Sequence, residues 1–254
     1  MKVMILDTET TSTSKPYCYN IGYIIYDTQT EQVVVKREFV VEQVWHNQPL
    51  FASAYYAEKR PLYVSAMRGR RAKLEKYGNI QKQMTRDIKY HDVQGVYAFN
   101  SAFDDGVFEF NANVYGCRNA IDSVPVFDIR GYAVEYLMTQ GYKEFCNSNE
   151  CDKLITPADG FRTTAESFYC FLTQNVDFNE EHTALADCEI ELEILKECIK
   201  RGATWQTEYM VARSYPRNIP KVMQLKDTDG TTYEFNYKRK IERQTDTGVV
   251  VTLK

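Results

Sequence analysis

The chain has 254 residues, of which 44% are hydrophobic and 26% charged, and its formal net charge is −4. This composition is ordinary for a globular protein with one sizeable domain and some additions, and it provides no overall positive charge that would attract nucleic acid. No apolar run approaches the ~20 residues that span a bilayer, and no signal-peptide pattern opens the chain. The seven cysteines are dispersed and odd in number, so we expect free thiols, a cytoplasmic protein and no membrane contact.

Three antiparallel strands are predicted at the start of the chain, over residues 2–6, 19–26 and 32–41. The first is a short apolar run that ends in acidic residues, as a buried central strand at a polar site would. Residues 27–30, between the second and third strands, form a hairpin connection.

The composition changes over residues 45–95, which we interpret as a helical insertion. Strong helix formers and few breakers predict helices over residues 53–58 and 69–88. Residues 59–89 are rich in lysine and arginine, with Glu75 and Asp87 as their only acids. This basic run, and a second one over residues 238–243, are either solvated faces or contacts for phosphate.

Strands and helices then alternate, which is typical of an α/β sheet. We expect strands over residues 95–99 and 124–127, and helices over residues 104–114 and 129–139. The fold class is therefore α/β, with a mixed five-stranded sheet flanked by helices.

Later helices are expected over residues 164–173, with Thr163 as N-cap, and over residues 184–200, which keep an apolar stripe and end before Gly202. Residues 147–160 between the earlier elements read as an irregular loop. Residues 203–254 have strand-like runs at 222–225, 232–237 and 249–253, with turn signals at 229–230 and 247–248. We interpret this last segment as a β-rich appendage to a domain of residues 1–202.

Acidic residues follow the first strand as Asp7 and Glu9. Residues i and i+2 of a strand point to the same side, so both carboxylates face one site. Hard cations such as Mg²⁺ prefer carboxylate oxygens, and two of them about 3.5–4 Å apart can assist hydrolysis of a phosphodiester. Thr8 and Thr10 can contact a substrate through their backbone or hydroxyl groups. Taken alone, an Asp-x-Glu sequence is also an ordinary strand-end turn.

Two more acids and a histidine complete the candidate site. Asp104 begins a predicted helix, where it could equally cap the helix dipole, and Asp105 competes with it for the same role. Asp187 lies in the first turn of the last long helix, with His182 on the loop before it. A histidine with a pKa near 6.5 can accept a proton from an attacking water at neutral pH.

In this order the residues resemble the DEDD exonuclease superfamily. Asp7-Thr8-Glu9 matches its first motif, Asn100-Ser101-Ala102-Phe103-Asp104 its second, and the His-x4-Asp spacing from His182 to Asp187 its third, in the histidine branch. Thr183 stands where the other branch has tyrosine. Residues 1–200 are similar to the epsilon-type proofreading subunit of bacterial polymerase III. The stretches at residues 54–63 and 161–195 are especially similar to bacteriophage exonucleases.

The resemblance implies a ribonuclease H-like fold and a 3′–5′ exonuclease that releases nucleoside 5′-monophosphates from DNA or RNA, in the cytoplasm of a bacterium or a phage-infected host. Asp7, Glu9, Asp104 and Asp187 would hold two Mg²⁺ or Mn²⁺ ions, and His182 would act as general base. Thr8, Thr10, Asn100 and Phe103 would contact the 3′-terminal nucleotide, with Phe103 available for stacking. No protein partner follows from the motifs.

Two alternatives stay open from the sequence. One is a catalytically silent protein that binds nucleic acid or serves as a replication scaffold. The other is a phosphodiesterase of short oligonucleotides or nucleotides that uses the same residues. The presence of all four acids and the histidine argues against the first, and the basic insertion weakly favours longer substrates over the second.

Overall fold

The computed structural model describes residues 1–157 and 160–205, and beyond them the backbone of five short strands. Those strands are β7 (Met210–Val211), β8 (Val222–Lys226), β9 (Thr232–Asn236), β10 (Ile241–Gln244) and β11 (Val250–Val251). The chain forms two compact units, which are described separately. Unit 1 comprises Met1–Tyr97, Phe103–Val126 and Glu181–Glu189, and unit 2 comprises Ala98–Ala102, Phe127–Glu180 and Ile190–Lys254.

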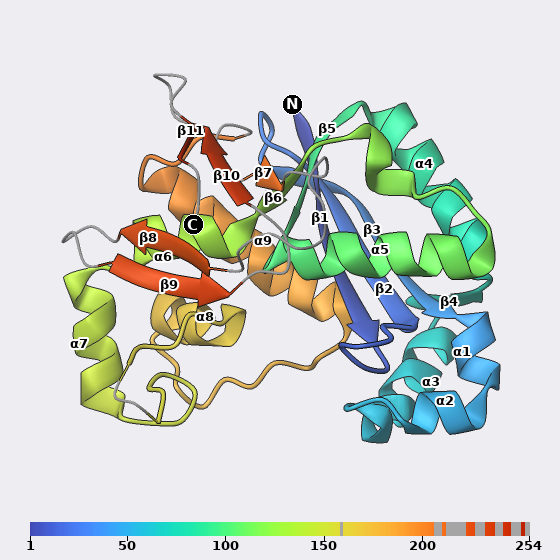
Figure 1. The fold of residues 1–254 in the computed structure, drawn as a ribbon, viewed down its shortest axis with the longest axis horizontal. Coiled ribbons are helices and arrows are strands. Elements are labelled where there is room, and N and C mark those ends of the chain that lie inside the picture. The colour runs from blue at the N-terminus through green and yellow to red at the C-terminus, as the bar shows by residue number, and fades with distance from the viewer. Residues whose placement is uncertain are drawn as a thin grey trace. The chain divides into compact units, whose positions relative to one another are not determined.

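Unit 1 is built on a mixed sheet whose central strand is β1 (Lys2–Thr10) (Figure 1). The strand is antiparallel to β2 (Cys18–Asp27), which is antiparallel to β3 (Gln32–Val41), as the sequence predicted. On its other side β1 is parallel to β5 (Val93–Ala98). Because β1 extends to Thr10, Asp7 and Glu9 lie within the strand and not after it.

The sheet has six strands from β1 to β6 where the sequence predicted five, and β7, β10 and β11 continue it beyond β6. At one edge β4 (Ala72–Glu75) pairs in parallel with β3. Next to β5, the chain entering β6 (Val126–Asp128) is joined by the Val96 N–H, which donates to the Pro125 carbonyl over 2.9 Å. The α/β class with helices around a mixed sheet is confirmed.

The predicted helix over residues 69–88 is wrong in its first part. Residues 72–75 form β4, and the helix α4 (Tyr77–His91) begins only after it. Ala-Lys-Leu-Glu has high intrinsic helix propensity, but pairing with the exposed edge of β3 provides backbone partners that the local sequence does not reveal.

The helix predicted over residues 53–58 is also wrong. The chain forms two short helices, α1 (Glu42–His46) and α2 (Gln48–Ala52), then a 3₁₀ turn η1 (Ala57–Lys59) and α3 (Arg60–Arg68). Pro49 and Pro61 stand in the first turns of α2 and α3, where a missing N–H costs nothing, so they start helices at these positions.

Helices cover both faces of the unit 1 sheet. Thr8 and Tyr23 point to one face, where Thr8 donates to Asp104 of α5 (Ser101–Tyr115) and Tyr23 donates to Asp87 of α4. Gly22, which is opposite Asp7, faces the first turns of α9 (Ala184–Lys200) on the other side. The active-site candidates Asp7 and Glu9 therefore point to the α9 face.

The N-terminus of α9 packs unusually close to β2. A Cβ atom at Gly22 would lie 2.3 Å from the backbone carbon of Ala184 and 2.3 Å from the backbone nitrogen of Leu185. Asn20 is buried two residues before Gly22 on the same strand, and its side chain accepts the Ala184 N–H over 2.8 Å. The lack of a side chain at Gly22 and the acceptor on Asn20 together fix the position of the helix N-terminus.

Unit 2 contains α6 (Ile129–Leu137), α7 (Gln140–Asn149), α8 (Ala165–Thr173) and the later turns of α9. Two expectations are corrected here. The region over residues 147–160 is not wholly irregular, because α7 reaches Asn149. The N-cap of α8 is Thr164 and not Thr163, and the Thr164 hydroxyl accepts the Ser167 N–H in a capping box.

The β strands of the last segment also belong to unit 2. Phe127 of β6 pairs with Met210 of β7, β10 pairs with both β7 and β11, and β8 and β9 form an antiparallel pair. The strands predicted over residues 222–225 and 232–237 are confirmed, whereas β7 and β10 were not expected. The turns predicted at 229–230 and 247–248 and the side chains of the basic run at 238–243 lie outside the described residues.

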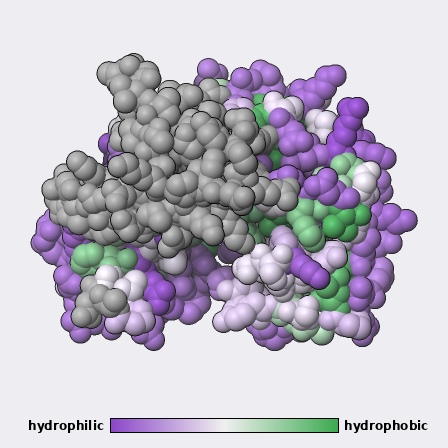
Figure 2. All heavy atoms as spheres, viewed as in Figure 1, coloured by the Kyte–Doolittle hydropathy of each residue, from purple (hydrophilic) through white to green (hydrophobic). Residues whose placement is uncertain are grey.

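Among the helices that are described, none is long and apolar enough to cross a membrane. All seven cysteines are free thiols, as expected. Hydrophilic residues occupy most of the margin of the described surface in Figure 2.

We predict that Gly22→Ala lowers the free energy of unfolding by about 1–3 kcal/mol, because the added methyl group meets backbone that has no room to relax. The matched control is Gly106→Ala in α5, where an added Cβ meets nothing within 4 Å. It should be neutral or about 0.5–1 kcal/mol more stable, since alanine is the better helix former. Urea unfolding followed by circular dichroism measures both variants. If Gly22→Ala were as stable as the wild type, the close packing of α9 on β2 would be contradicted.

Candidate active site

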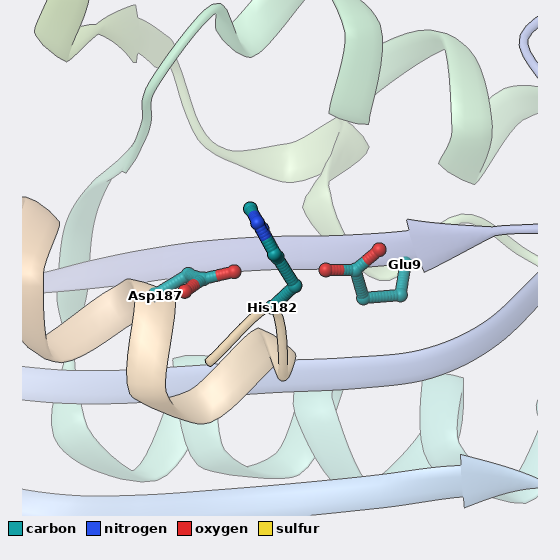
Figure 3. Close-up of side chains that lie close together, drawn as sticks. All are labelled: Glu9, His182 and Asp187. Carbon is teal, nitrogen blue, oxygen red and sulfur yellow. The ribbon is translucent and has the colours of Figure 1, made fainter. Parts of the chain in front are cut away.

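Three side chains of unit 1 converge on one point. Glu9 comes from β1, His182 from the loop before α9, and Asp187 from the first turn of α9. One potential ligand atom from each lies within 4.8 Å of the other two. Figure 3 shows the carboxylates of Glu9 and Asp187 pointing toward each other, with the His182 ring between them.

Asp7 belongs to the same electrostatic cluster. It lies two residues before Glu9 on β1 and so points to the same face. Its charge raises the pKa of both Glu9 and Asp187, and in each case it is the largest contribution after burial. Three carboxyl groups are therefore close enough to oppose one another's ionisation.

The pKa values measure how poorly this site tolerates negative charge without a counterion. Burial, followed by the charges of Asp7 and Asp187, raises the pKa of Glu9 to about 10. Burial and Asp7 raise the pKa of Asp187 to about 8. Lys59 lowers both values without offsetting the rise. Glu9 and Asp187 therefore hold protons at neutral pH in the absence of a bound cation.

A divalent cation fits this donor set. Asp187 Oδ1 is buried and has no hydrogen-bond partner, and a buried carboxylate oxygen is stabilised by a donor or a cation. Carboxylate oxygens are the ligands that Mg²⁺ and Mn²⁺ prefer. The cluster therefore has the chemistry of a site for hard cations.

The segment from α2 to α3 holds the His182 loop. The Tyr56 ring stacks on the imidazole of His182, with centroids 4.2 Å apart and planes 13° apart. The Tyr63 hydroxyl donates to the His182 carbonyl over 3.2 Å, and Lys59 donates to the Glu181 carbonyl. His182 itself has a φ of +52°, a left-handed conformation that the contacts on both sides stabilise.

Tyr56, Lys59 and Tyr63 are the functional candidates that the motifs missed. They come from residues 54–63, the stretch whose resemblance to phage exonucleases was evident, and Lys59 opens the basic run. The resemblance indicated that this stretch mattered, but only the folded chain shows that it contacts the histidine loop.

Asp104 takes a different position from the other acids. It is buried, and its Oδ1 accepts the Thr8 hydroxyl over 2.6 Å. Because Thr8 points to the face opposite Asp7 and Glu9, Asp104 meets β1 from the α5 side. It is not among the three clustered side chains, and Asp105 beside it is equally buried. Asp104 as a metal ligand stays a prediction.

The expected substrate contacts are placed as follows. The Thr8 hydroxyl is used within the protein, so its backbone is the part left for a substrate. Thr10 donates weakly to the Ser12 carbonyl over 3.3 Å, and Phe103 is half-buried in the first turn of α5. Asn100 belongs to unit 2, has a φ of +60° and donates its N–H to Asp128 over 3.2 Å.

The mixed sheet with its flanking helices is the ribonuclease H-like exonuclease fold. The sequence itself matches no family profile and no curated protein. Among solved structures, the chain is similar to a 3′-exonuclease in 3′-end specific recognition of a histone mRNA stem-loop. That match has a TM-score of 0.54 and 11% identity, and covers 85% of this chain and 72% of the other. It is also similar to cell-death related nuclease 4, with a TM-score of 0.52, 13% identity and coverage of 86% and 71%.

We predict that the protein without metal loses stability as the pH rises from about 5 to 8. The folded-state pKa of Asp187 lies above the unfolded value, so the folded chain binds more protons in this window and its advantage disappears as they leave. Asp187→Asn does not ionise and should escape part of this loss. In EDTA, the melting temperature of the variant should exceed that of the wild type by a margin that grows as the pH rises. The margin is about 2–4 °C for each kcal/mol of difference in the free energy of unfolding.

Melting curves at pH 5.5 and pH 8 provide the measurement. Adding Mn²⁺ at pH 8 should stabilise the wild type and have less effect on Asp187→Asn, since a ligand stabilises the state that binds it. Parallel pH profiles for the two proteins would show that Asp187 does not titrate in the buried cluster.

Proposed function

We propose that the protein is a metal-dependent 3′–5′ exonuclease of DNA or RNA, with single strands as the first substrate to test. The observation that carries this proposal is the convergence of Glu9, His182 and Asp187, with Asp7 beside them, on a ribonuclease H-like exonuclease fold. A carboxylate cluster with a histidine at its edge has the groups that phosphodiester hydrolysis needs.

Asp7, Glu9 and Asp187 would hold divalent cations, Mg²⁺ or Mn²⁺, with Asp104 as the proposed fourth acid. Two such ions supply charge stabilisation for the attacking and leaving oxygens of a phosphodiester. Replacement of the protons on Glu9 and Asp187 by these cations would remove the repulsion that raises their pKa values.

His182 would take the proton of the attacking water. The histidine belongs to a loop and not to a regular element, so its ring must be oriented by contacts. Stacking on Tyr56 supplies that orientation for the ring, and the bond from Tyr63 holds the backbone. These contacts leave the ring beside Glu9 and Asp187.

The 3′-terminal nucleotide would lie at the carboxyl-terminal end of β1. Thr8 through its backbone, Thr10, Asn100 and Phe103 are the proposed contacts, and nucleoside 5′-monophosphates are the proposed products. One of the structural neighbours is a 3′-exonuclease that recognises an RNA end, which supports a polynucleotide substrate.

The finer assignments are proposals as well. They are membership of the histidine branch, a phage-type or proofreading relationship, a cytoplasmic setting, and a division into residues 1–202 and an appendage of residues 203–254. The spacing of His182 and Asp187 supports the first of them.

We predict that the purified protein with Mn²⁺ or Mg²⁺ shortens a 5′-labelled single strand one nucleotide at a time from its 3′ end, and that excess EDTA abolishes the reaction. Denaturing gels taken over time measure the ladder of products, with DNA and RNA strands and their duplexes in parallel. Early internal cuts would contradict exonuclease action, and binding without cleavage would favour the silent scaffold. Cleavage restricted to dinucleotides would favour the phosphodiesterase of short substrates.

His182→Ala should lower kcat by about 10²–10⁴-fold, the range expected for loss of a general base, while Mn²⁺ binding is retained. His46→Ala is the matched control, because His46 is exposed on α1. Single-turnover rates on the labelled strand measure the loss. An unchanged rate in His182→Ala would contradict the role of general base.

Tyr56→Ala should lower kcat about fivefold with a smaller effect on KM, because ring stacking that contributes about 1 kcal/mol holds the imidazole in place. Tyr56→Phe keeps the ring and should restore most of the rate. Tyr90→Ala, at a tyrosine that is 84% exposed on α4, is the control. Equal rates in Tyr56→Ala and Tyr56→Phe would contradict positioning by stacking.

A further inference from the structure

A cavity lies in unit 1, and its lining shares no residue with the carboxylate cluster. Its volume is about 750 Å³, within the range of small-molecule sites. Residues of α4 as far as Arg86 and the turn that follows α5, with Tyr115 at the end of that helix, form its walls. None of the proposed catalytic residues lines it.

The charged residues that line this cavity are all cations: Lys76, Lys82, Arg86 and Arg118. They are exposed at its rim, and three of them belong to α4 or its N-cap. Glu75 contacts the lining, but its carboxylate is already paired: it accepts from Asn79 and forms an ion pair of 2.7 Å with Lys73. The cavity therefore presents a positive field to a ligand.

The N-terminus of α4 lines this cavity, and two of its N–H groups already have side-chain acceptors. The Tyr77 N–H donates to Gln43 Oε1 and the Lys76 N–H to Glu75 Oε1, each over 3.1 Å. Lys76 stands at the N-cap position and makes no capping bond, and Gly78 and Asn79 of the first turn line the cavity. The positive end of the helix dipole favours an anion nearby. Cys117, also in the lining, stays a neutral thiol because burial raises its pKa.

Gln81 supplies an independent sign of a ligand. The residue is 2% exposed and lines the cavity. Its Oε1 accepts the Ala120 N–H over 2.8 Å, which fixes the orientation of the amide, and its Nε2 is buried with no hydrogen-bond partner. A buried amide donor without an acceptor is costly, so a bound acceptor is expected to stabilise it.

We propose that this cavity is a second binding site, specific for the phosphate group of a nucleotide. The four cations would bind the phosphate, and Gln81 Nε2 would donate to a ligand oxygen. The Tyr115 ring offers an aromatic surface for a base. The nucleotide is either a free nucleoside monophosphate or one unit of a strand, and both present the same chemistry. The inference does not depend on catalysis at the carboxylate cluster.

The experiment is equilibrium binding in EDTA, so that no metal site contributes. Adenosine 5′-monophosphate and inorganic phosphate are titrated by calorimetry, and a fluorescent twelve-nucleotide single strand by anisotropy. The Lys82→Glu/Arg86→Glu variant should bind at least about tenfold more weakly, since each lost charged contact is worth roughly tenfold in affinity. Lys89→Glu, which reverses an exposed charge on the same helix outside the cavity, is the matched control.

Gln81→Glu keeps the acceptor for Ala120 and replaces the free donor by a second acceptor, so it should also weaken binding. Melting curves establish whether each variant is folded, and loss of binding in a folded Lys82→Glu/Arg86→Glu protein supports the site even where Gln81→Glu unfolds. Binding of the free nucleotide indicates a mononucleotide site, and binding of the strand alone indicates a strand contact. The same affinity in the double variant as in Lys89→Glu, or no binding of any of the three probes, overturns the proposal.

Discussion

The close approach of α9 to β2 is the constraint on which the rest of the site depends. Gly22 has no side chain at the point where the backbone of Ala184 passes, and Asn20 accepts the first N–H of the helix. This close packing brings the first turn of α9, and with it Asp187, over the face of β1 that carries Glu9. A larger residue at position 22 would move the helix and separate carboxylates that belong to distant parts of the sequence.

That proximity has an electrostatic cost. Buried carboxyl groups next to one another cannot all ionise in the absence of a counterion, and the raised pKa values of Glu9 and Asp187 express this conflict. Lys59 relieves it only in part. The same repulsion would be the source of the proposed affinity for a divalent cation, so stability and the proposed catalysis would be coupled at one place.

Much of the fold was predictable because its signals are local. The opening strands follow from a short apolar run and a hairpin connection, and α9 follows from an apolar stripe. The spacing of His182 and Asp187 indicated that these two residues act together. Strand β4 was not predictable, because its residues favour a helix and become a strand only by pairing with β3. The stacking of Tyr56 on His182 joins residues 126 positions apart and has no local signature. Asp104 could be identified as an acid at a helix start, but the side of β1 that it approaches became evident only from its bond to Thr8.

Equilibrium binding of Mn²⁺, followed by electron paramagnetic resonance, tests the central claim most directly. The account predicts saturable binding to the wild type at neutral pH, and its loss in the folded Glu9→Gln/Asp187→Asn variant, because both changes remove ligand charge while keeping the shape of the side chain. Mn²⁺ binding of the same stoichiometry and affinity in the variant, or none in the wild type, would contradict the assignment of these carboxylates as a metal site.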